Sequence, residues 1–204
     1  MTDHFQNTAQ PDRDWWETLW SDPSQVIERL GVDDDDSVVD ICAGEGLFSI
    51  ALAEQTDGSV YALELDTDHL AALEARADRA GVTVETMEAD ARDLDDALAE
   101  PVEFALLGNT FHGVADQKAF AETVRTALTD DGRFAVVNWH DRPKAETTVL
   151  GEERGPPTAL RMTPEETTAI GTAAGFEVES VIDLPPYHYG VVFRSTADSD
   201  DRRS

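Results

Sequence analysis

The feature that most constrains the fold of this chain is a regular alternation of short apolar segments with longer amphipathic ones. The apolar segments are rich in Val, Ile, Leu and aromatic residues and are bounded by turn residues, which is typical of strands. The segments between them repeat apolar residues at helical spacing. We predict strands at 37–42, 59–64, 82–87, 102–107 and 133–139, and helices at 47–54, 66–79, 94–99, 116–128 and 163–174. This alternation predicts an α/β fold with a mostly parallel, doubly wound sheet and helices on both faces.

The C-terminal part adds two consecutive strands, predicted at 176–184 and 187–194 and separated only by Pro185 and Pro186. Such a connection is too short for a crossover, so the last strand should run antiparallel. A length of 204 residues suits one domain. We expect this domain at residues 15–194, with an N-terminal helical cap at 15–31, a disordered or extended tail at 1–14 and a disordered tail at 195–204.

The charge of the chain is strongly negative and narrows the possible partners. Its 43 acidic and 15 basic residues give a formal net charge of −28, and only Lys118 and Lys144 are lysines. Nucleic acids and anionic membranes attract clustered Lys and Arg, so we expect neither as a partner. Because 41% of the residues are hydrophobic, the composition indicates a folded, salt-adapted protein, similar to the proteins of halophilic archaea. No signal-peptide pattern and no membrane-spanning apolar run is visible, which predicts a soluble, cytoplasmic protein.

A glycine-rich turn joins the first predicted strand to the helix after it. Gly44 and Gly46 allow a tight turn and close approach of a ligand to the backbone. Glu64 ends the second strand, 20 residues after Gly44, where a carboxylate can bind a ribose diol. Asp40 and Glu45 lie in the turn itself, which suits a cationic ligand better than a pyrophosphate. S-adenosylmethionine, with an ammonium and a sulfonium group, is such a ligand.

A third acidic residue, Asp90, follows the third predicted strand. Its carboxylate can accept the exocyclic amine of adenine, and the N–H of Ala91 can donate to the ring. Any one acid in so acidic a chain is more often a surface residue, but three at successive strand ends favour a nucleoside site. A nicotinamide-dependent oxidoreductase is an alternative, although Ser49 replaces the third glycine of the dinucleotide fingerprint and no Tyr precedes a Lys by four residues. A non-catalytic S-adenosylmethionine-binding module is another.

Over residues 38–194 the chain resembles the class I S-adenosylmethionine-dependent methyltransferases, of the small single-domain type related to ubiquinone and menaquinone biosynthesis methyltransferases. The resemblance rests on the turn at 40–46, in which Cys42 replaces the first glycine, and on segments 60–64, 88–91 and 107–112. It implies a seven-stranded Rossmann-like sheet in the order 3-2-1-4-5-7-6, S-adenosylmethionine as methyl donor and S-adenosylhomocysteine as product. It also implies a donor site made by Asp40, Ala43, Gly44, Glu45, Gly46, Glu64, Leu65, Asp90, Ala91 and Asn109.

We expect a small-molecule acceptor near the ends of the fourth and fifth strands. His112, after the fourth strand, is the candidate general base or acceptor-orienting group, and a solvated loop histidine is the alternative reading. Trp139 and His140 end the fifth strand, and Tyr187 and His188 begin the last one. If these two strands are antiparallel, His140 and His188 share one rim of the acceptor site.

Residues 141–162 form a long segment without a clear period, and its four acidic and four basic residues make it neutral. Long loops of this kind are often lids. We hypothesise that this one covers the acceptor and that Arg154 or Arg161 binds an anionic group on it. In the alternative interpretation, both arginines pair with neighbouring acids on the surface.

Two further groups of residues have a less specific meaning. Trp15, Trp16 and Trp20 could line the site as an aromatic wall or pack as one face of an amphipathic helix. Cys42 is the only cysteine, so no intrachain disulfide can form, and its position at a strand end favours a buried, inert thiol. The five histidines lack metal-ligand spacing, so we expect no metal site. The acceptor, the methylated atom and the oligomeric state stay open.

Overall fold

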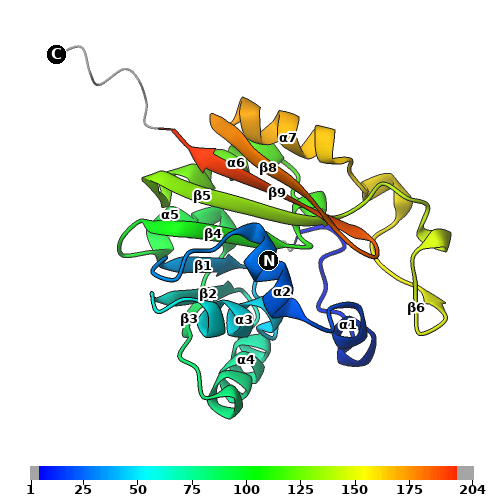
Figure 1. Ribbon diagram of the computed structural model, residues 1–204, viewed down its shortest axis with the longest axis horizontal. Helices are drawn as coiled ribbons and strands as arrows, with labels where there is room; N and C mark the ends of the chain where they lie inside the picture. Colours follow the sequence, from blue (N-terminus) through cyan, green and yellow to red (C-terminus); the bar gives the residue numbers. More distant parts are fainter. Residues whose placement is uncertain (1–4, 197–204) are drawn as a thin grey trace.

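A seven-stranded sheet forms the centre of the protein (Figure 1). The computed structural model describes residues 5–196. The sheet has the order β3-β2-β1-β4-β5-β9-β8. Its strands are β1 (Val38–Ile41), β2 (Val60–Glu64), β3 (Glu85–Glu88), β4 (Val102–Gly108), β5 (Leu128–Trp139), β8 (Phe176–Leu184) and β9 (His188–Ser195). β9 is antiparallel to both β5 and β8, and the remaining pairs are parallel.

The predicted fold class, strand order and antiparallel last strand are therefore confirmed. The strand numbers differ, because β6 (Thr148–Val149) and β7 (Glu152–Glu153) form a separate hairpin within residues 141–162. β5 also begins at Leu128 rather than at the predicted residue 133, because residues 102 and 128 already pair across β4 and β5. The predicted sixth and seventh strands are thus β8 and β9.

The central strands are buried on both faces. All four residues of β1 are buried, and β4 is buried from Phe104 to Leu107. Parallel strands covered by helices on both sides need such continuous apolar runs rather than an alternating pattern. Val38 of β1 pairs with Val60 of β2 and with Phe104 of β4, so the carboxyl ends of these strands meet at one edge. Ligands of open α/β sheets bind at that edge.

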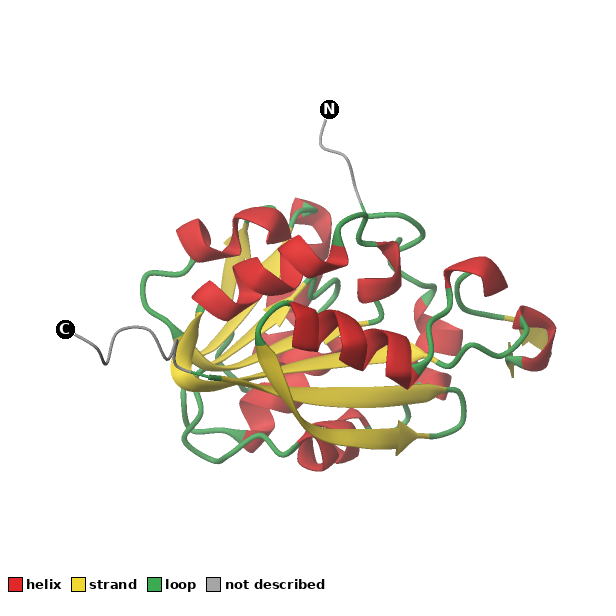
Figure 2. Cartoon of the chain, turned by 90° about the horizontal axis from the view of Figure 1, so that it is seen from above, coloured by secondary structure: helices red, strands yellow, loops and turns green. Residues whose placement is uncertain are grey.

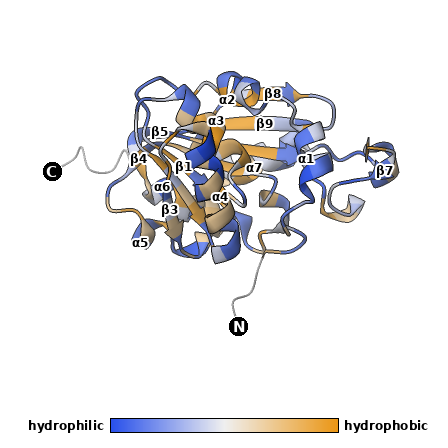
Figure 3. Cartoon of the chain, turned by 90° about the horizontal axis from the view of Figure 1, so that it is seen from below, coloured by the Kyte–Doolittle hydropathy of each residue, from blue (hydrophilic) through white to orange (hydrophobic). Residues whose placement is uncertain are grey.

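Helices cover both faces of the twisted sheet (Figure 2). On one face, α1 (Arg13–Leu19), α2 (Pro23–Leu30) and α3 (Leu47–Gln55) share a core that contains Trp20, Ile27 and Leu52. On the other, α5 (Leu94–Ala97), α6 (Gln117–Thr126) and α7 (Pro164–Ala173) pack around Leu94 and Phe120. α4 (Thr67–Ala80) contacts β2, β3 and α3. Figure 3 shows the apolar residues concentrated on the central strands and the polar ones on the outer surfaces of the helices.

The helix ends follow local signals in the sequence. The side chain of Asp22 accepts the N–H of Gln25 and Pro23 is the first residue of α2, so the helical cap divides into two helices here. Gly81 ends α4 in the left-handed conformation, with φ +73°. Thr163 and Glu166 form a reciprocal capping box at the start of α7.

Two segments without predicted elements are ordered by tertiary contacts. In residues 5–11, part of the expected tail, the N–H of Gln6 donates to the carbonyl of Gly113 at 3.0 Å, and the rings of Phe5 and Phe120 meet edge-on at 5.7 Å. Residues 141–162 hold the β6–β7 hairpin and short 3₁₀ turns at Lys144–Glu146 and Thr158–Leu160. The ends of the two predicted tails, residues 1–4 and 197–204, lie outside the described residues.

In the part of the chain that the structure describes, no helix has the length and apolar character needed to cross a membrane.

Candidate functional site

The turn between β1 and α3 has an unusual backbone conformation. Gly44 and Gly46 have φ values of +54° and +79°, a region that side chains other than glycine rarely adopt. A Cβ on Gly46 would lie 2.5 Å from Cγ of Leu73, so packing also requires glycine there. Cys42 and Asn109, which follow β1 and β4, have positive φ values of 59° and 57°. Two adjacent central strands thus end in strained residues, a feature that is common at functional sites.

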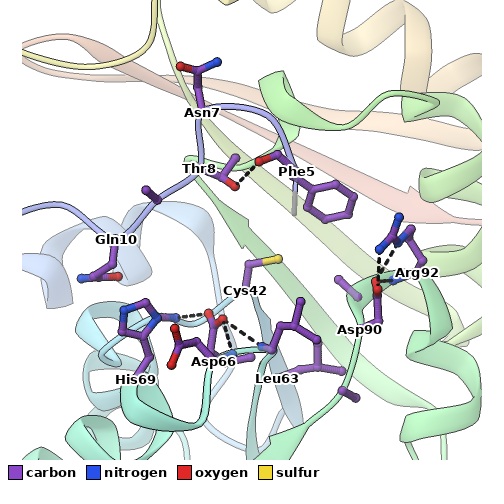
Figure 4. A pocket seen from close by; sticks show the side chains of 16 residues that line it. Phe5, Asn7, Thr8, Gln10, Cys42, Leu63, Asp66, His69, Asp90 and Arg92 are labelled. Carbon is purple, nitrogen blue, oxygen red and sulfur yellow. Dashed lines mark hydrogen bonds and ion pairs between the residues drawn. The ribbon is translucent and has the colours of Figure 1, made fainter. Parts of the chain in front are cut away.

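A first pocket of about 540 Å³ lies beyond the ends of β2 and β3 (Figure 4). Leu65, Asp66, His69, Ala91 and Arg92 line it, together with Glu64, Asp90 and residues of the 5–11 segment. Figure 4 shows Phe5 and Thr8 across this pocket from Asp66. The expected ribose and adenine residues are therefore brought together at one cavity.

Glu64 is held in place by the backbone of the turn and of its own strand end. Its Oε2 accepts the N–H of Gly44 at 2.9 Å, and its Oε1 accepts those of Leu65 and Asp66 at 2.8 and 3.0 Å. A carboxylate has about four acceptor positions, so these three bonds leave one for a ligand. The carboxylate thereby fixes the spacing between the glycine turn and the end of β2.

The carboxylate of Asp90 also interacts with a neighbouring residue, Arg92. Its Oδ1 accepts the N–H of Arg92 at 3.0 Å, and its Oδ2 lies 2.5 Å from Nη2 of the same arginine. Ala91, the next residue, is buried. An adenine amine that binds Asp90 would have to share this carboxylate with Arg92.

A second pocket of about 330 Å³ lies beyond the ends of β1 and β4. It is lined by the predicted residues Asp40, Ala43, Asn109, His112 and Trp139. Both pockets include Asn7, Thr8, Ala9, Gln10 and Cys42 in their linings. The two pockets are therefore neighbouring compartments along one edge of the sheet, with residues 7–10 bordering both.

Asp40 is a carboxylate that is strongly affected by its surroundings. It is 2% exposed, and one of its oxygens accepts the hydroxyl of Ser49 at 2.6 Å. Burial, reinforced by the nearby negative charge of Glu64, raises the pKa of Asp40 from 3.8 to about 7. A cation placed in the second pocket would favour the ionised form of this group.

Glu45 does not take the position that the sequence predicted. Its carboxylate forms ion pairs with Arg13 of α1 and, at 3.9 Å, with Arg76 of α4, and Glu45 lines neither of the two pockets. The tight turn directs this side chain toward α1 and α4 instead. Gly46 also lies outside the pocket linings, because it is buried against Leu73.

His112 is buried next to the second pocket. Its Nδ1 lies 3.3 Å from Oδ1 of Asn138, and its Nε2 lies 3.2 Å from the carbonyl oxygen of Asn7. Burial lowers the pKa of His112, which favours the neutral ring. A neutral imidazole has one N–H, so it can donate to only one of these two oxygens.

Arg154 and Arg161, the two arginines expected to bind the acceptor, form their polar contacts within the loop. Arg161 is 7% exposed and donates to the carbonyl oxygens of Pro156, Arg142 and Arg154 and to the hydroxyl of Thr147. Arg154 pairs with Glu152 at 3.0 Å, and its guanidinium lies 5.0 Å from the ring centre of Trp15. Neither arginine lines the first or the second pocket, so the expected contact with an acceptor has no support in their positions. A third residue of the loop, Lys144, lines the second pocket instead.

His140 and His188 do not share a rim, contrary to the expectation. Trp139 pairs with His188 across β5 and β9, and His188 is fully buried between the rings of Trp20 and Trp139, at 4.4 and 4.2 Å. Burial lowers the pKa of His188 well below its usual value. Nε2 of His140, one residue beyond Trp139, lies 3.1 Å from Oδ1 of Asp183, which can accept a hydrogen bond from it. Successive strand residues point to opposite faces, which separates the two rings.

Tyr187 and the tryptophans have mainly structural contacts. Tyr187 stacks on Trp139 at 6.0 Å, and its hydroxyl donates to the carbonyl of Thr148 at 2.9 Å, which fixes the β6–β7 hairpin. Trp15 and Trp16 line the second pocket, whereas Trp20 packs inside the core. The aromatic wall and the packing interpretation thus apply to different members of this group.

Sequence reasoning missed the 5–11 segment as part of the site. The polar composition of this segment gave no signal, but the glycine at position 113 is an indirect sign that another segment packs closely there. A Cβ at Gly113 would lie 2.2 Å from the carbonyl oxygen of Gln6, so the segment can cross here only over glycine. Cys42 borders both pockets and is partly rather than fully buried, and the pKa of its thiol is raised by burial and by neighbouring carboxylates, which disfavours the reactive thiolate. Among residues 5–196, no group of three or more His, Cys, Asp or Glu residues could hold a metal ion.

Comparisons with known proteins agree with the fold described above. Residues 38–132 match a family described as a methyltransferase domain. The structure is similar to a SAM-dependent methyltransferase from Aquifex aeolicus, with 21% identity, a TM-score of 0.74, and coverage of 90% of this chain and 93% of that one. It is similar to an S-adenosylmethionine-dependent methyltransferase from Clostridium acetobutylicum, with 10% identity, a TM-score of 0.66, and coverage of 93% and 94%. No curated protein matches the sequence.

The fold also occurs with a different reaction. The [4+2]-cyclase SpnF is similar to this chain with 15% identity, a TM-score of 0.70, and coverage of 95% of this chain and 87% of that one. A shared fold therefore leaves the reaction to be argued from the site. The chain has the Rossmann-like fold of the class I S-adenosylmethionine-dependent methyltransferases, and its residues 38–132 match the methyltransferase domain.

Proposed function

We propose that this protein transfers a methyl group from S-adenosylmethionine to a small-molecule acceptor. The observation that carries the proposal is the position of three carboxylates at the ends of three adjacent strands. Asp40 lies one residue before the end of β1 beside the second pocket, while Glu64 at the end of β2 and Asp90 just beyond β3 line the first pocket. Such a row of acids suits a nucleoside that carries a sulfonium and an ammonium group.

The residues present fit this donor. Glu64 keeps one acceptor position for a ribose hydroxyl, and Asp90 with Ala91 faces the compartment that suits adenine. In the described chain, Nδ2 and Oδ1 of Asn109 are buried without a hydrogen-bond partner beside the second pocket. Buried polar atoms of this kind need partners, and the amino-acid end of the donor has groups that can supply them.

The same geometry is less suitable for a nicotinamide dinucleotide. A pyrophosphate at the glycine turn would need positive charge, but Arg13 and Arg76 are paired with Glu45. The charged side chains that line the pockets at the turn and at the end of β2, Asp40 and Glu64, are acidic, which favours a cationic nucleoside.

The chain's own contribution to methyl transfer would be orientation and exclusion of water. When bound, the donor supplies a sulfonium methyl group, and S-adenosylhomocysteine remains after the transfer. Trp15, Trp16 and Trp139 shield the second pocket with apolar surface. We propose that His112 orients the acceptor and takes up a proton released from it at its unprotonated ring nitrogen, exchanging the contact with Asn7 or Asn138 for one with the acceptor, because burial favours the neutral ring and His112 borders the same pocket.

The donor assignment is tested by thermal unfolding in concentrated KCl with S-adenosylmethionine, S-adenosylhomocysteine and NADH. A ligand at 100 times its Kd stabilises the folded state by about 2.7 kcal/mol, so the first two should raise Tm clearly. Glu64→Gln should weaken this shift, whereas Glu45→Gln, a matched change in the same loop region outside both pockets, should preserve it. A shift with NADH alone would refute the proposal. Formation of S-adenosylhomocysteine with an acceptor then distinguishes an enzyme from a non-catalytic binding module.

We further propose that the protein works in a salt-rich cytoplasm, without nucleic-acid or membrane partners. The net charge of −28 supports this, since it repels polyanions and is screened by salt. The relation to ubiquinone and menaquinone methyltransferases stays a prediction.

A further inference from the structure

Lys144 differs in its setting from Arg154 and Arg161 of the same loop. It is partly buried, lines the second pocket, and forms no ion pair with any residue that the structure describes. Asp40 is the only carboxylate among the described residues that line this pocket, and the pKa of His112 is lowered toward the neutral form. Lys144 is therefore the one permanent cation in the lining of the described second pocket. In a chain with 43 acidic residues, an unpaired lysine at a cavity calls for a functional reason.

The backbone of Lys144 is fixed. Its N–H donates to the hydroxyl of Thr158 at 2.9 Å, and its carbonyl oxygen accepts both the N–H and the hydroxyl of Thr147, at 3.0 and 2.9 Å. Thr147 is itself bound by Arg161, which is buried at the centre of the loop. Arg161 thus holds the loop backbone in place, and the loop positions Lys144 at the pocket.

The remaining walls of the pocket are flat and apolar. Trp15, Trp16 and Phe48 belong to helices on one face of the sheet, and Pro156 and Pro157 belong to the loop. Trp139 is immobilised by the guanidinium of Arg161, 5.2 Å from its ring centre, and by the stacked ring of Tyr187. Rigid aromatic walls with one permanent cation suit a flat apolar ligand that carries a negative charge.

The volume of the second pocket limits the size of the acceptor. Its volume of about 330 Å³ must also admit the amino-acid end of the donor, whose expected contacts Asp40, Ala43 and Asn109 lie in the same lining. The space that is left suits a molecule of one or two rings rather than a polymer or a long chain.

Resting on the proposed methyltransferase function, we infer that the acceptor is a small aromatic acid whose carboxylate binds Lys144 and whose ring lies against the tryptophan and proline walls. The two ends of the cleft then differ in charge, with carboxylates at the donor end and a lysine at the acceptor end. This arrangement deepens the expectation that a basic residue of the 141–162 loop binds an anionic acceptor, and it assigns that role to Lys144.

The test uses calorimetric titration of the full-length protein saturated with S-adenosylhomocysteine. The probes are benzoate, 1-naphthoate and indole-3-acetate, each compared with its neutral primary amide. At least one acid should bind about 10- to 100-fold more tightly than its amide, as expected for a hydrogen bond between charged groups. Lys144→Gln should abolish this preference, and Lys144→Arg should restore most of it.

The chain offers a matched control in its only other lysine. Lys118 pairs with Glu122 on the exposed side of α6 and lines none of the pockets, so Lys118→Gln should bind acids and amides as the wild type does. Affinity for S-adenosylhomocysteine should be the same in all four proteins. If the wild type does not bind S-adenosylhomocysteine, the proposed function fails. If it binds, but no acid binds better than its amide or Lys144→Gln keeps the preference, the aromatic-acid inference alone is overturned.

Discussion

Replacing Asp40 by Asn should have opposite effects on stability and on donor binding. Folding raises the pKa of Asp40 from 3.8 to about 7, a change of about 3 pH units, because burial disfavours its charge. At about 1.4 kcal/mol per unit, the ionised carboxylate costs the unliganded protein about 4 kcal/mol at pH 8. Asn has nearly the same shape but no charge, so it removes this cost. A cationic donor gains from the same charge, and Asn removes that gain too.

The sign of the pH dependence follows from the direction of the shift. Since the folded pKa lies above the unfolded one, the folded state binds more protons between pH 4 and 7. The contribution of Asp40 to stability is therefore complete below pH 4 and is lost as the pH rises through 7. Asp40→Asn has no such dependence. The free energy of unfolding of the wild type, relative to the variant, should fall by about 3 kcal/mol between pH 5 and pH 8.

The assay is urea unfolding of both proteins at pH 5, 6, 7 and 8 at constant KCl, followed by donor titration at pH 6 and 8. Using the difference between the proteins cancels the pH response of the other acids. The wild type should bind S-adenosylmethionine about 10-fold more weakly at pH 6 than at pH 8, relative to the variant, because only about a tenth of Asp40 is ionised at pH 6. Parallel stability curves for the two proteins would refute the reasoning about Asp40.

Three further predictions concern stability. Gly46→Ala should lower the free energy of unfolding by about 1–3 kcal/mol, since its φ of +79° and the Leu73 side chain 2.5 Å from the new Cβ both oppose a side chain; equal urea midpoints would contradict this. Arg161→Met should lower Tm and destabilise by about 3–5 kcal/mol, because several buried hydrogen bonds of the loop are lost, whereas a raised KM at unchanged Tm would indicate a direct acceptor contact instead. Raising KCl from 0.1 to 2 M should increase Tm because salt screens the net charge of −28, and a Tm independent of salt would argue against a salt-adapted surface.

Elements specified by local sequence could be predicted well. The capping box at Thr163, the helix break at Pro23 and the left-handed turn at Gly46 depend on residues within a few positions of each other. The order of the sheet was predicted too, but through a resemblance rather than through any local signal. Asp40, Glu64 and Asp90 could be predicted to lie along one edge because each stands at or near a strand end, and parallel strands end at one edge.

The acceptor side could not be predicted in the same way. Whether Arg154, Arg161 or Lys144 reaches the pocket depends on how the 141–162 loop folds over Trp139, and this loop has little regular structure. The pairing of β5 with β9 was expected, yet it put His188 inside the core, because alternate residues of a strand face opposite sides.

By itself, the sequence determined the alternation of strands and helices, the glycine turn and the acids at the strand ends. These features act over a few residues, and burial of the apolar strands then requires one kind of sheet. Only the tertiary structure decided that Glu45 turns to Arg13, that Arg161 is buried and Lys144 borders the pocket, and that residues 5–11 cross the site. Each of these outcomes depends on contacts between residues far apart in the chain. Such contacts form only when the sheet has brought the segments together.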